Sequence, residues 1–168
     1  KLACKAYVSS YCNNYGIEGY IIRPANVIGS RGRHGVTWDF INKLKETPDT
    51  LHVLGNGKQR KSYIHVSDAV DGFFHCMQKV AKNVEIYNLG SQDSIDVMNI
   101  AKIVIKNMNL ESSKIITDGG IDEGRGWIGD IRFAHLDITK LKNLGWSPKL
   151  ASNESVELAS KELQKDLL

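Results

Sequence analysis

The fold of this chain is decided by one stretch of its sequence, Ile21-Ile22-Arg23-Pro24-Ala25-Asn26-Val27-Ile28-Gly29-Ser30-Arg31. The apolar residues at its start predict a buried strand. Pro24 is expected to end that strand, because proline has no N–H to give to a neighbouring strand. Asn26 then carries a donor and an acceptor just past the strand's carboxyl end, where ligands bind in open α/β sheets. The alternative is an ordinary strand exit with a structural asparagine.

Composition places the chain among globular domains and excludes several classes of function. With 168 residues, 42% hydrophobic and 24% charged, it is long enough to bury one sizeable core. A net charge of +3 is too small to indicate nucleic acid or an anionic membrane as partner, and no apolar run approaches membrane-spanning length. The three cysteines are odd in number and lack metal-ligand spacing, so we expect reduced thiols in a cytoplasmic protein without a metal site.

Helical and strand-like periodicities alternate along the chain, which favours an α/β fold with a largely parallel sheet. The expected helices cover 1–15, 37–46, 67 or 68 to about 80, a segment after Asp96, a short segment after Asp137, and 153 to the end. The expected strands lie in 19–27, 51–54, 62–66, 84–89 and 114–117, and 118–129 is expected to be an irregular loop. No Gly-x-Gly-x-x-Gly fingerprint stands between an expected strand and an expected helix, since the one such spacing, at 124–129, lies in the expected irregular loop. The chain also opens inside a helical pattern, so we expect a fragment.

Caps and inward faces can also be predicted. Gly16 is a natural stop for the first helix. Later helices are expected to be capped by Thr37, by either Ser67 or Asp68, by Asp96 and by Asp137. The first helix carries a stripe at helical spacing formed by Ala3, Ala6, Tyr7, Ser10 and Tyr11. The residues expected to face inward from the helix after residue 67 are Ala69, Val70, Phe73, Phe74 and Met77.

Few residues suggest chemistry on their own. Arg60, Lys61 and Arg125 suit a diphosphate, the alternative being a solvated basic surface. His52 and Leu54 share a strand face and could flank a flat base, although strand periodicity favours Leu54 in the core and His52 at the surface. Asp130 could accept hydrogen bonds from hydroxyl groups, or it could be a turn aspartate.

Several segments in order resemble the extended short-chain dehydrogenase family, and most closely its nucleotide-sugar epimerases of the prokaryotic UDP-glucose 4-epimerase type. They are Lys1-Leu2-Ala3-Cys4-Lys5-Ala6, Arg23-Pro24-Ala25-Asn26-Val27-Ile28-Gly29, the run from Leu54 to Asp68, Tyr87-Asn88-Leu89-Gly90, Asp137-Ile138-Thr139-Lys140-Leu141 and Leu144-Gly145-Trp146. Together these segments cover nearly the whole chain.

The resemblance implies the C-terminal part of a Rossmann-type doubly wound parallel sheet plus a small α/β substrate-binding domain. Residues 1–30 would be the last part of the NAD-binding domain. Residues 31–168 would be mainly substrate-binding, with 63–90 returning a helix and a strand to the Rossmann sheet. Lys1 would be the catalytic lysine that holds the nicotinamide ribose and lowers the pKa of a tyrosine four positions upstream.

The resemblance also assigns the ligand contacts. Pro24 and Val27 would lie beside the nicotinamide. The residues that would contact the nucleotide sugar are Asn26, Val36, His52, Leu54, Arg60, Lys61, Arg125 and Asp130. Three positions depart from the family pattern: Lys61 stands where an arginine is usual, Ser62 where an aspartate is usual, and Trp127 at the spacing of a diphosphate-binding arginine.

The implied reaction is epimerisation of a UDP-sugar at C4, through a keto intermediate, with NAD as cofactor. The alternatives are a nucleotide-sugar 4,6-dehydratase and a family member that binds nucleotide sugar without turnover. The isolated chain is expected to be inactive, since the catalytic tyrosine and the NAD cradle would lie outside it. The family often dimerises through two helices, so a homodimer is expected, and the stripe of Tyr7, Tyr11 and Tyr15 would take part.

Overall fold

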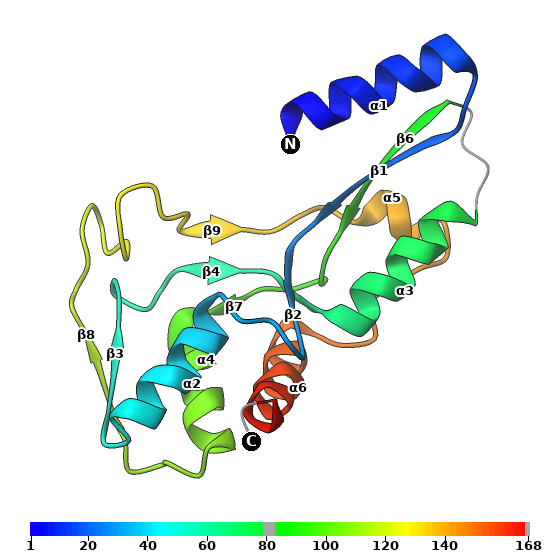
Figure 1. Cartoon of the computed structure of the whole chain (residues 1–168). Coiled ribbons are helices and arrows are strands. Elements are labelled where there is room, and N and C mark those ends of the chain that lie inside the picture. The colour runs from blue at the N-terminus through cyan, green and yellow to red at the C-terminus, as the bar shows by residue number, and fades with distance from the viewer. Residues whose placement is uncertain (79–82, 167–168) are drawn as a thin grey trace.

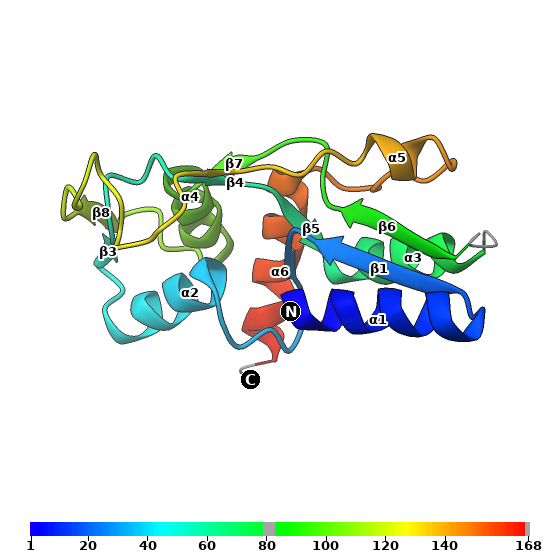
Figure 2. The same ribbon diagram turned by 90° about the horizontal axis from the view of Figure 1, so that it is seen from above.

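The computed structural model describes residues 1–78 and 83–166. One end of the molecule is a pair of parallel strands, β1 (Gly19–Pro24) and β6 (Val84–Leu89), which run in register from Gly19↔Val84 to Pro24↔Leu89. Helix α1 (Leu2–Tyr15) lies along one side of this pair, and helix α3 (Val66–Met77) lies along the other (Figures 1 and 2). This is the arrangement of a layered α/β fold, as predicted.

The other end of the molecule consists of short strands and helices (Figure 1). Parallel pairs are formed by β2 (Asn26–Ile28) with β5 (Tyr63–His65) and by β3 (Thr50–Val53) with β8 (Lys114–Thr117). A further sheet has the order β7 (Ile95–Asp96), β4 (Arg60–Lys61), β9 (Phe133–Ala134). The remaining helices are α2 (Val36–Glu46), α4 (Val97–Asn107), α5 (Thr139–Lys142) and α6 (Ser152–Lys165).

Two hydrophobic clusters meet at strand β5. The larger one joins α2, β3, α4 and α6, and Tyr63 belongs to it. The smaller one joins α3 and β6 to the region of Leu141 and Trp146, and Ile64 belongs to it. Successive side chains of a strand point to opposite faces, so these two neighbours reach different cores. Strand β5 is therefore the shared wall between the two ends of the molecule.

The exit of the deciding stretch agrees with the prediction at Pro24 and differs from it at Asn26. β1 ends at Pro24, as predicted, and the Ala25 amide just after it donates to the Leu89 carbonyl. The expected loop at Asn26 is a second short strand, β2. The turn follows later, at the buried Gly29, whose φ is 155°.

The helices occur where periodicity predicts them, but the inward face predicted for α3 was largely wrong. The stripe of α1 is exposed, and Cys12 is the residue of this helix that is buried, close to Gly19. In α3, Ala69, Gly72 and Cys76 are buried, while Val70, Phe73, Phe74 and Met77 are exposed. The expected end of this helix, near residue 80, lies outside the described residues. Apolar spacing gives a helix's period and not which of two apolar faces is covered.

The caps differ in a similar way. The cap of α3 is His65, whose side chain accepts a hydrogen bond from the Ser67 amide. Asp68 accepts instead from the amides of Lys149 and Leu150. Thr37 is buried inside α2, one residue after the first helical position, and is not its cap. The predicted caps Asp96 for α4 and Asp137 before α5 do bind the backbone amides of Asn99 and Thr139.

Two further observations concern only the described part of the chain. No helix there combines the length and the apolar character needed to cross a membrane. Within the same residues, no group of three or more His, Cys, Asp or Glu side chains is arranged to hold a metal ion.

Candidate nucleotide-sugar site

A cavity of about 330 Å³ lies between α2, the end of β3, the β4–β5 segment and the loop before β9. That volume is in the range of small-molecule sites. The residues that line it are Gly35, Val36, Asp39, Phe40, Lys43, Leu54, Gln59, Lys61, Tyr63, Val97, Trp127 and Asp130. Four of the residues predicted to contact substrate are among them: Val36, Leu54, Lys61 and Asp130. Sequences more than 90 residues apart therefore meet at one place.

An ion pair forms the polar part of the cavity. Lys61 Nζ lies 3.0 Å from Asp130 Oδ1, and the other carboxylate oxygen of Asp130 accepts from the Gly126 amide and from Gln59 Nε2. Burial raises the pKa of Asp130. The hydrogen bonds that it accepts, chiefly from Lys61 and Gly126, together outweigh this effect, so the pKa lies below its ordinary value. Asp130 is thus a buried, ionised acceptor, suited to hydroxyl donors.

Trp127 gives the cavity an aromatic side. Its ring centroid is 5.6 Å from Lys61 Nζ, within the range of a cation–π contact, and about half of the residue is exposed. Leu54, Phe40 and Val36 add apolar surface to the same lining. A planar ring could therefore stack beside a cation and a carboxylate.

Tyr63 is the tyrosine of this cavity. Burial, with a smaller contribution from the charge of Asp130, raises its pKa to about 12. The phenol consequently keeps its proton at neutral pH and can donate a hydrogen bond. It is not a general base under those conditions.

The alternation of side chains along the extended segment before α3 decides which of its residues line the cavity. Gln59, Lys61 and Tyr63 all line the cavity, whereas Arg60 and Ser62 do not. Residues at i, i+2 and i+4 share one face of an extended chain. Gln59 itself is fixed, because its Nε2 donates to the Leu54 carbonyl and to Asp130.

Four predicted substrate contacts are not brought to this cavity: Arg60, His52, Arg125 and Asn26. The Arg60 guanidinium binds Ser94 through its hydroxyl and carbonyl oxygens and lines a separate hollow with Lys58 and Arg132. His52 is exposed on β3 and does not line the cavity, whereas Leu54, just past the end of that strand at Val53, does. Arg125 is partly buried and does not belong to the lining, and its Nε has no hydrogen-bond partner among the described residues.

The residues predicted beside the cofactor lie elsewhere. Pro24 and Val27 line a second hollow, of about 370 Å³, between the strands and α3. Its other lining residues are almost all apolar: Ile22, Val66, Ala69, Val70, Phe73, Phe74 and Leu89. Such a wall suits one face of a flat ring.

Asn26, on β2, donates from its side-chain amide to the Ser62 carbonyl over 2.9 Å, which leaves its amide oxygen as an acceptor. Lys1 is exposed at the start of α1 and lines neither hollow.

Several lining residues were missed from the sequence. Tyr63 and Gln59 could have been found from their alternation with Lys61. Phe40 could have been found from its position one turn after Val36 on the same helix. Trp127 lies in an irregular loop, where no periodicity indicates which way a side chain points.

Comparisons with known proteins agree with this architecture. The sequence model of the "NAD dependent epimerase/dehydratase family" matches residues 1–90. A putative UDP-glucose 4-epimerase of Methanocaldococcus jannaschii is 29% identical over 161 residues, which are 94% of this chain and 49% of that protein. The dTDP-D-glucose 4,6-dehydratase of Mus musculus is 28% identical over 160 residues, 94% of this chain and 44% of that protein.

A solved structure is similar as well. The UDP-glucose 4-epimerase of Thermotoga maritima, determined with UDP-glucose, is 26% identical with a TM-score of 0.83, and the match covers 100% of this chain and 53% of that one. This chain spans about half the length of the proteins that it matches.

Proposed function

This chain belongs to the NAD dependent epimerase/dehydratase family, and from that premise we propose that its cavity binds the nucleotide sugar of a UDP-sugar 4-epimerase. One observation carries the proposal. A buried carboxylate, a cation and an exposed aromatic ring line one cavity, as Asp130, Lys61 and Trp127. A nucleotide sugar offers the matching groups, namely hydroxyls, phosphates and a planar base.

Each group has a proposed role. Asp130 accepts hydrogen bonds from hydroxyls, such as those of the ribose, since its lowered pKa keeps it ionised. Lys61 faces the diphosphate as a point charge, without the bidentate fork of an arginine. Leu54, Val36 and Trp127 pack against the base or the sugar. Asn26 does not line the cavity, and on the family resemblance alone it is proposed to contact the sugar through its amide oxygen. Arg60, Arg125 and His52 lie away from the cavity, so any contact of theirs would need a movement.

The family implies NAD, and the second hollow fits one part of it. Pro24 and Val27 are proposed to form the apolar wall beside the nicotinamide ring. When bound, NAD supplies the acceptor and the donor of the hydride at sugar C4. This chain's residues contribute binding and orientation. Lys1 is proposed to hold the nicotinamide ribose on the family resemblance alone.

Domain organisation, assembly and location follow as proposals. Residues 1–30 with 63–90 would belong to the NAD-binding domain, and the remainder of 31–168 would bind substrate. Tyr7, Tyr11 and Tyr15 are exposed along α1, which supports a homodimer through that helix. The free cysteines Cys4, Cys12 and Cys76 support a reducing, cytoplasmic environment.

The test is calorimetric titration of the chain with UDP-glucose. We expect binding that Asp130→Ala weakens about tenfold or more, because a hydrogen bond to a charged group contributes about 1.5–3 kcal/mol. The exposed Asp49→Ala, in the turn before β3, serves as the matched control. Absence of binding to the unmodified chain would sink the proposal.

A 4,6-dehydratase is the second candidate, favoured by the dehydratase relative. It predicts a preference for dTDP-glucose over UDP-glucose in the same titration. A family member without turnover would bind a nucleotide sugar but stay inactive as the full-length protein.

A further inference from the structure

The connection between β2 and α2 carries part of the cavity wall. It runs from Gly29 to Gly35, and Gly35 and Val36 at its end line the cavity. Three of its residues have positive φ: Gly29 at 155°, Arg31 at 60° and Gly35 at 87°. Arg31 has a side chain, so its left-handed conformation costs about 1–2 kcal/mol. Something must hold this backbone in place.

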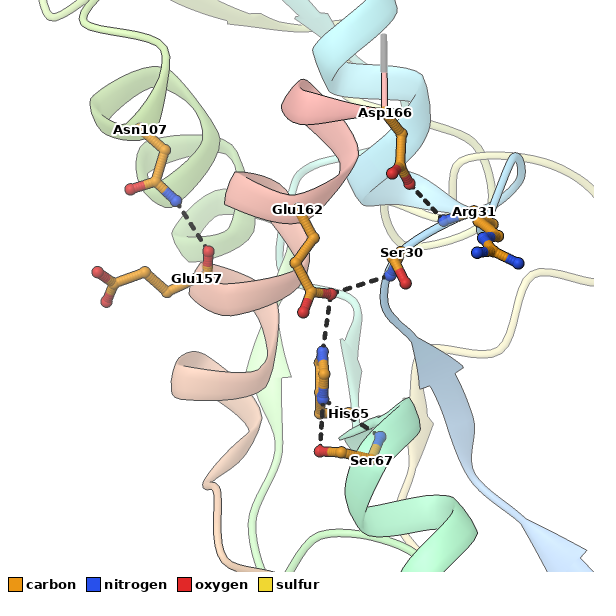
Figure 3. Close-up of polar contacts among 8 residues, drawn as sticks. All are labelled: Ser30, Arg31, His65, Ser67, Asn107, Glu157, Glu162 and Asp166. Carbon is orange, nitrogen blue, oxygen red and sulfur yellow. Dashed lines mark hydrogen bonds and ion pairs between the residues drawn. The ribbon is translucent and has the colours of Figure 1, made fainter. Parts of the chain in front are cut away.

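Helix α6 provides two carboxylates for that purpose (Figure 3). The Ser30 amide donates to Glu162 Oε2 over 2.9 Å, and the Arg31 amide donates to Asp166 Oδ2 over 2.5 Å. Glu162 and Asp166 are four residues apart and so share one face of the helix. Two consecutive amides of the connection are therefore bound by successive turns of α6.

Glu162 is held in turn by the buried His65. The Ser67 N–H donates to His65 Nδ1, and because a backbone amide can only donate, the ring proton lies on Nε2. Nε2 is 3.0 Å from Glu162 Oε2, so it donates there (Figure 3). One carboxylate oxygen thus accepts from both the sheet and the connection.

At Gly29 the connection packs closely against His65 and its neighbour Val66. A Cβ placed on Gly29 would lie 2.5 Å from Val66 Cγ1 and 3.4 Å from His65 Nε2. The connection therefore begins in direct contact with His65 and Val66 and continues along α6 before it reaches the cavity.

We propose that Glu162 is a positioning residue: it fixes Ser30 and Arg31 and thereby sets the wall formed by Gly35 and Val36. The affinity part of this inference rests on the proposed function, whereas the conformational part does not. Within the described residues, the side-chain hydrogen bonds of Glu162 go to Ser30 and His65, neither of which lines the cavity, so it acts through the connection.

The test compares three variants of the full chain. Glu162→Leu removes the acceptor, Glu162→Gln keeps an acceptor oxygen, and Glu157→Leu is the control, since Glu157 is on the same helix and its side chain pairs with Lys161. Hydrogen exchange of the Ser30 amide and the methyl NMR signals of Val36 are measured in each. For Glu162→Leu we expect Ser30 to exchange about tenfold faster and the Val36 signals to shift. Glu162→Gln and Glu157→Leu should resemble the unmodified chain.

Affinity for UDP-glucose gives the third readout. Glu162→Leu should weaken it several-fold, and Glu162→Gln should restore it. Unchanged Val36 signals, or unchanged affinity despite faster Ser30 exchange, would overturn the proposal and leave Glu162 with a stabilising role only. If the unmodified chain does not bind UDP-glucose, the proposed function fails, and the Ser30 and Val36 readouts still decide the inference.

Should Glu162→Leu not fold, Asp166→Ala removes the neighbouring acceptor at the helix end and is expected to free the Arg31 amide with a smaller shift at Val36.

Discussion

Lys61 Nζ and Asp130 Oδ1 lie 3.0 Å apart, across 69 residues of sequence, and they join β4 to the loop before β9. The Asp130 side chain is 2% exposed and that of Lys61 is 21% exposed. The pair therefore has two roles. It fixes the loop that carries Trp127, and it supplies the charges of the cavity.

Replacing Lys61 by Met should leave a buried carboxylate without its cation. Breaking a buried pair in this way costs about 3 kcal/mol or more, and the partial exposure of Lys61 places this case at the lower end. Urea unfolding at neutral pH measures the loss. Lys61→Arg keeps the charge and should recover most of the stability, and equal losses in both variants would contradict an electrostatic role.

The stability of the chain should fall in acid through Asp130. Its pKa in the folded chain lies below its ordinary value, so the folded state binds this proton less readily than the unfolded state does. The resulting stabilisation is fully present above the unfolded pKa, at about 4, and is lost as the pH falls through the lower folded pKa. Asp130→Asn should thus flatten the decline of unfolding free energy below pH ~4, whereas the exposed Glu111→Gln should not.

The 168-residue chain should bind UDP-glucose without epimerising it. The tyrosine that lines its cavity has a pKa of about 12 and remains protonated. The one Gly-x-Gly-x-x-Gly spacing of the sequence, at 124–129, lies between β8 and β9 and not between a strand and a helix. A coupled assay for UDP-galactose, with NAD added, checks this. Turnover that disappears in Tyr63→Phe would refute the inactive role given to that phenol.

Gly29→Ala should destabilise the chain more than Gly16→Ala does. Both glycines have positive φ, at 155° and 65°. A methyl group at Gly16 meets nothing within 4 Å, whereas one at Gly29 would lie 2.5 Å from Val66. We expect about 1 kcal/mol for Gly16 from backbone strain, and about 2–4 kcal/mol for Gly29 from strain plus overpacking, measured by thermal unfolding. Equal effects would argue against the close contact.

The sequence was most informative where local chemistry decides the structure. Gly16 stops α1 in the left-handed conformation and Asp96 caps α4, because both effects depend on a few neighbouring residues. It failed where tertiary packing decides. Phe73 and Phe74 have the spacing of an inward face but remain exposed, while the small Gly72 takes the packed position against Leu89 and Trp146.

The site shows the same division. Lys61 and Asp130 were each predicted to contact the nucleotide sugar, but no pattern in the sequence indicated that they form an ion pair with one another. Strand alternation places Arg60 and Lys61 on opposite faces of the segment. It also places Tyr63 on the face of Lys61, and so it would have identified Tyr63 as a lining residue. The direction of Trp127 depends on the path of a loop with several left-handed residues, among them Asp122, Glu123 and Gly124, and that path is fixed by contacts far away in sequence.

Strand β5 has a consequence for the thermodynamics of the whole chain. Tyr63 and Ile64 are covalent neighbours that belong to different hydrophobic clusters, and the strand that carries them is bonded to β2 and, through Ser152, to α6. Neither cluster can lose this strand without the other losing its wall. The two ends of the molecule should therefore unfold as one cooperative unit, and a substitution that weakens either cluster should lower a single transition common to both.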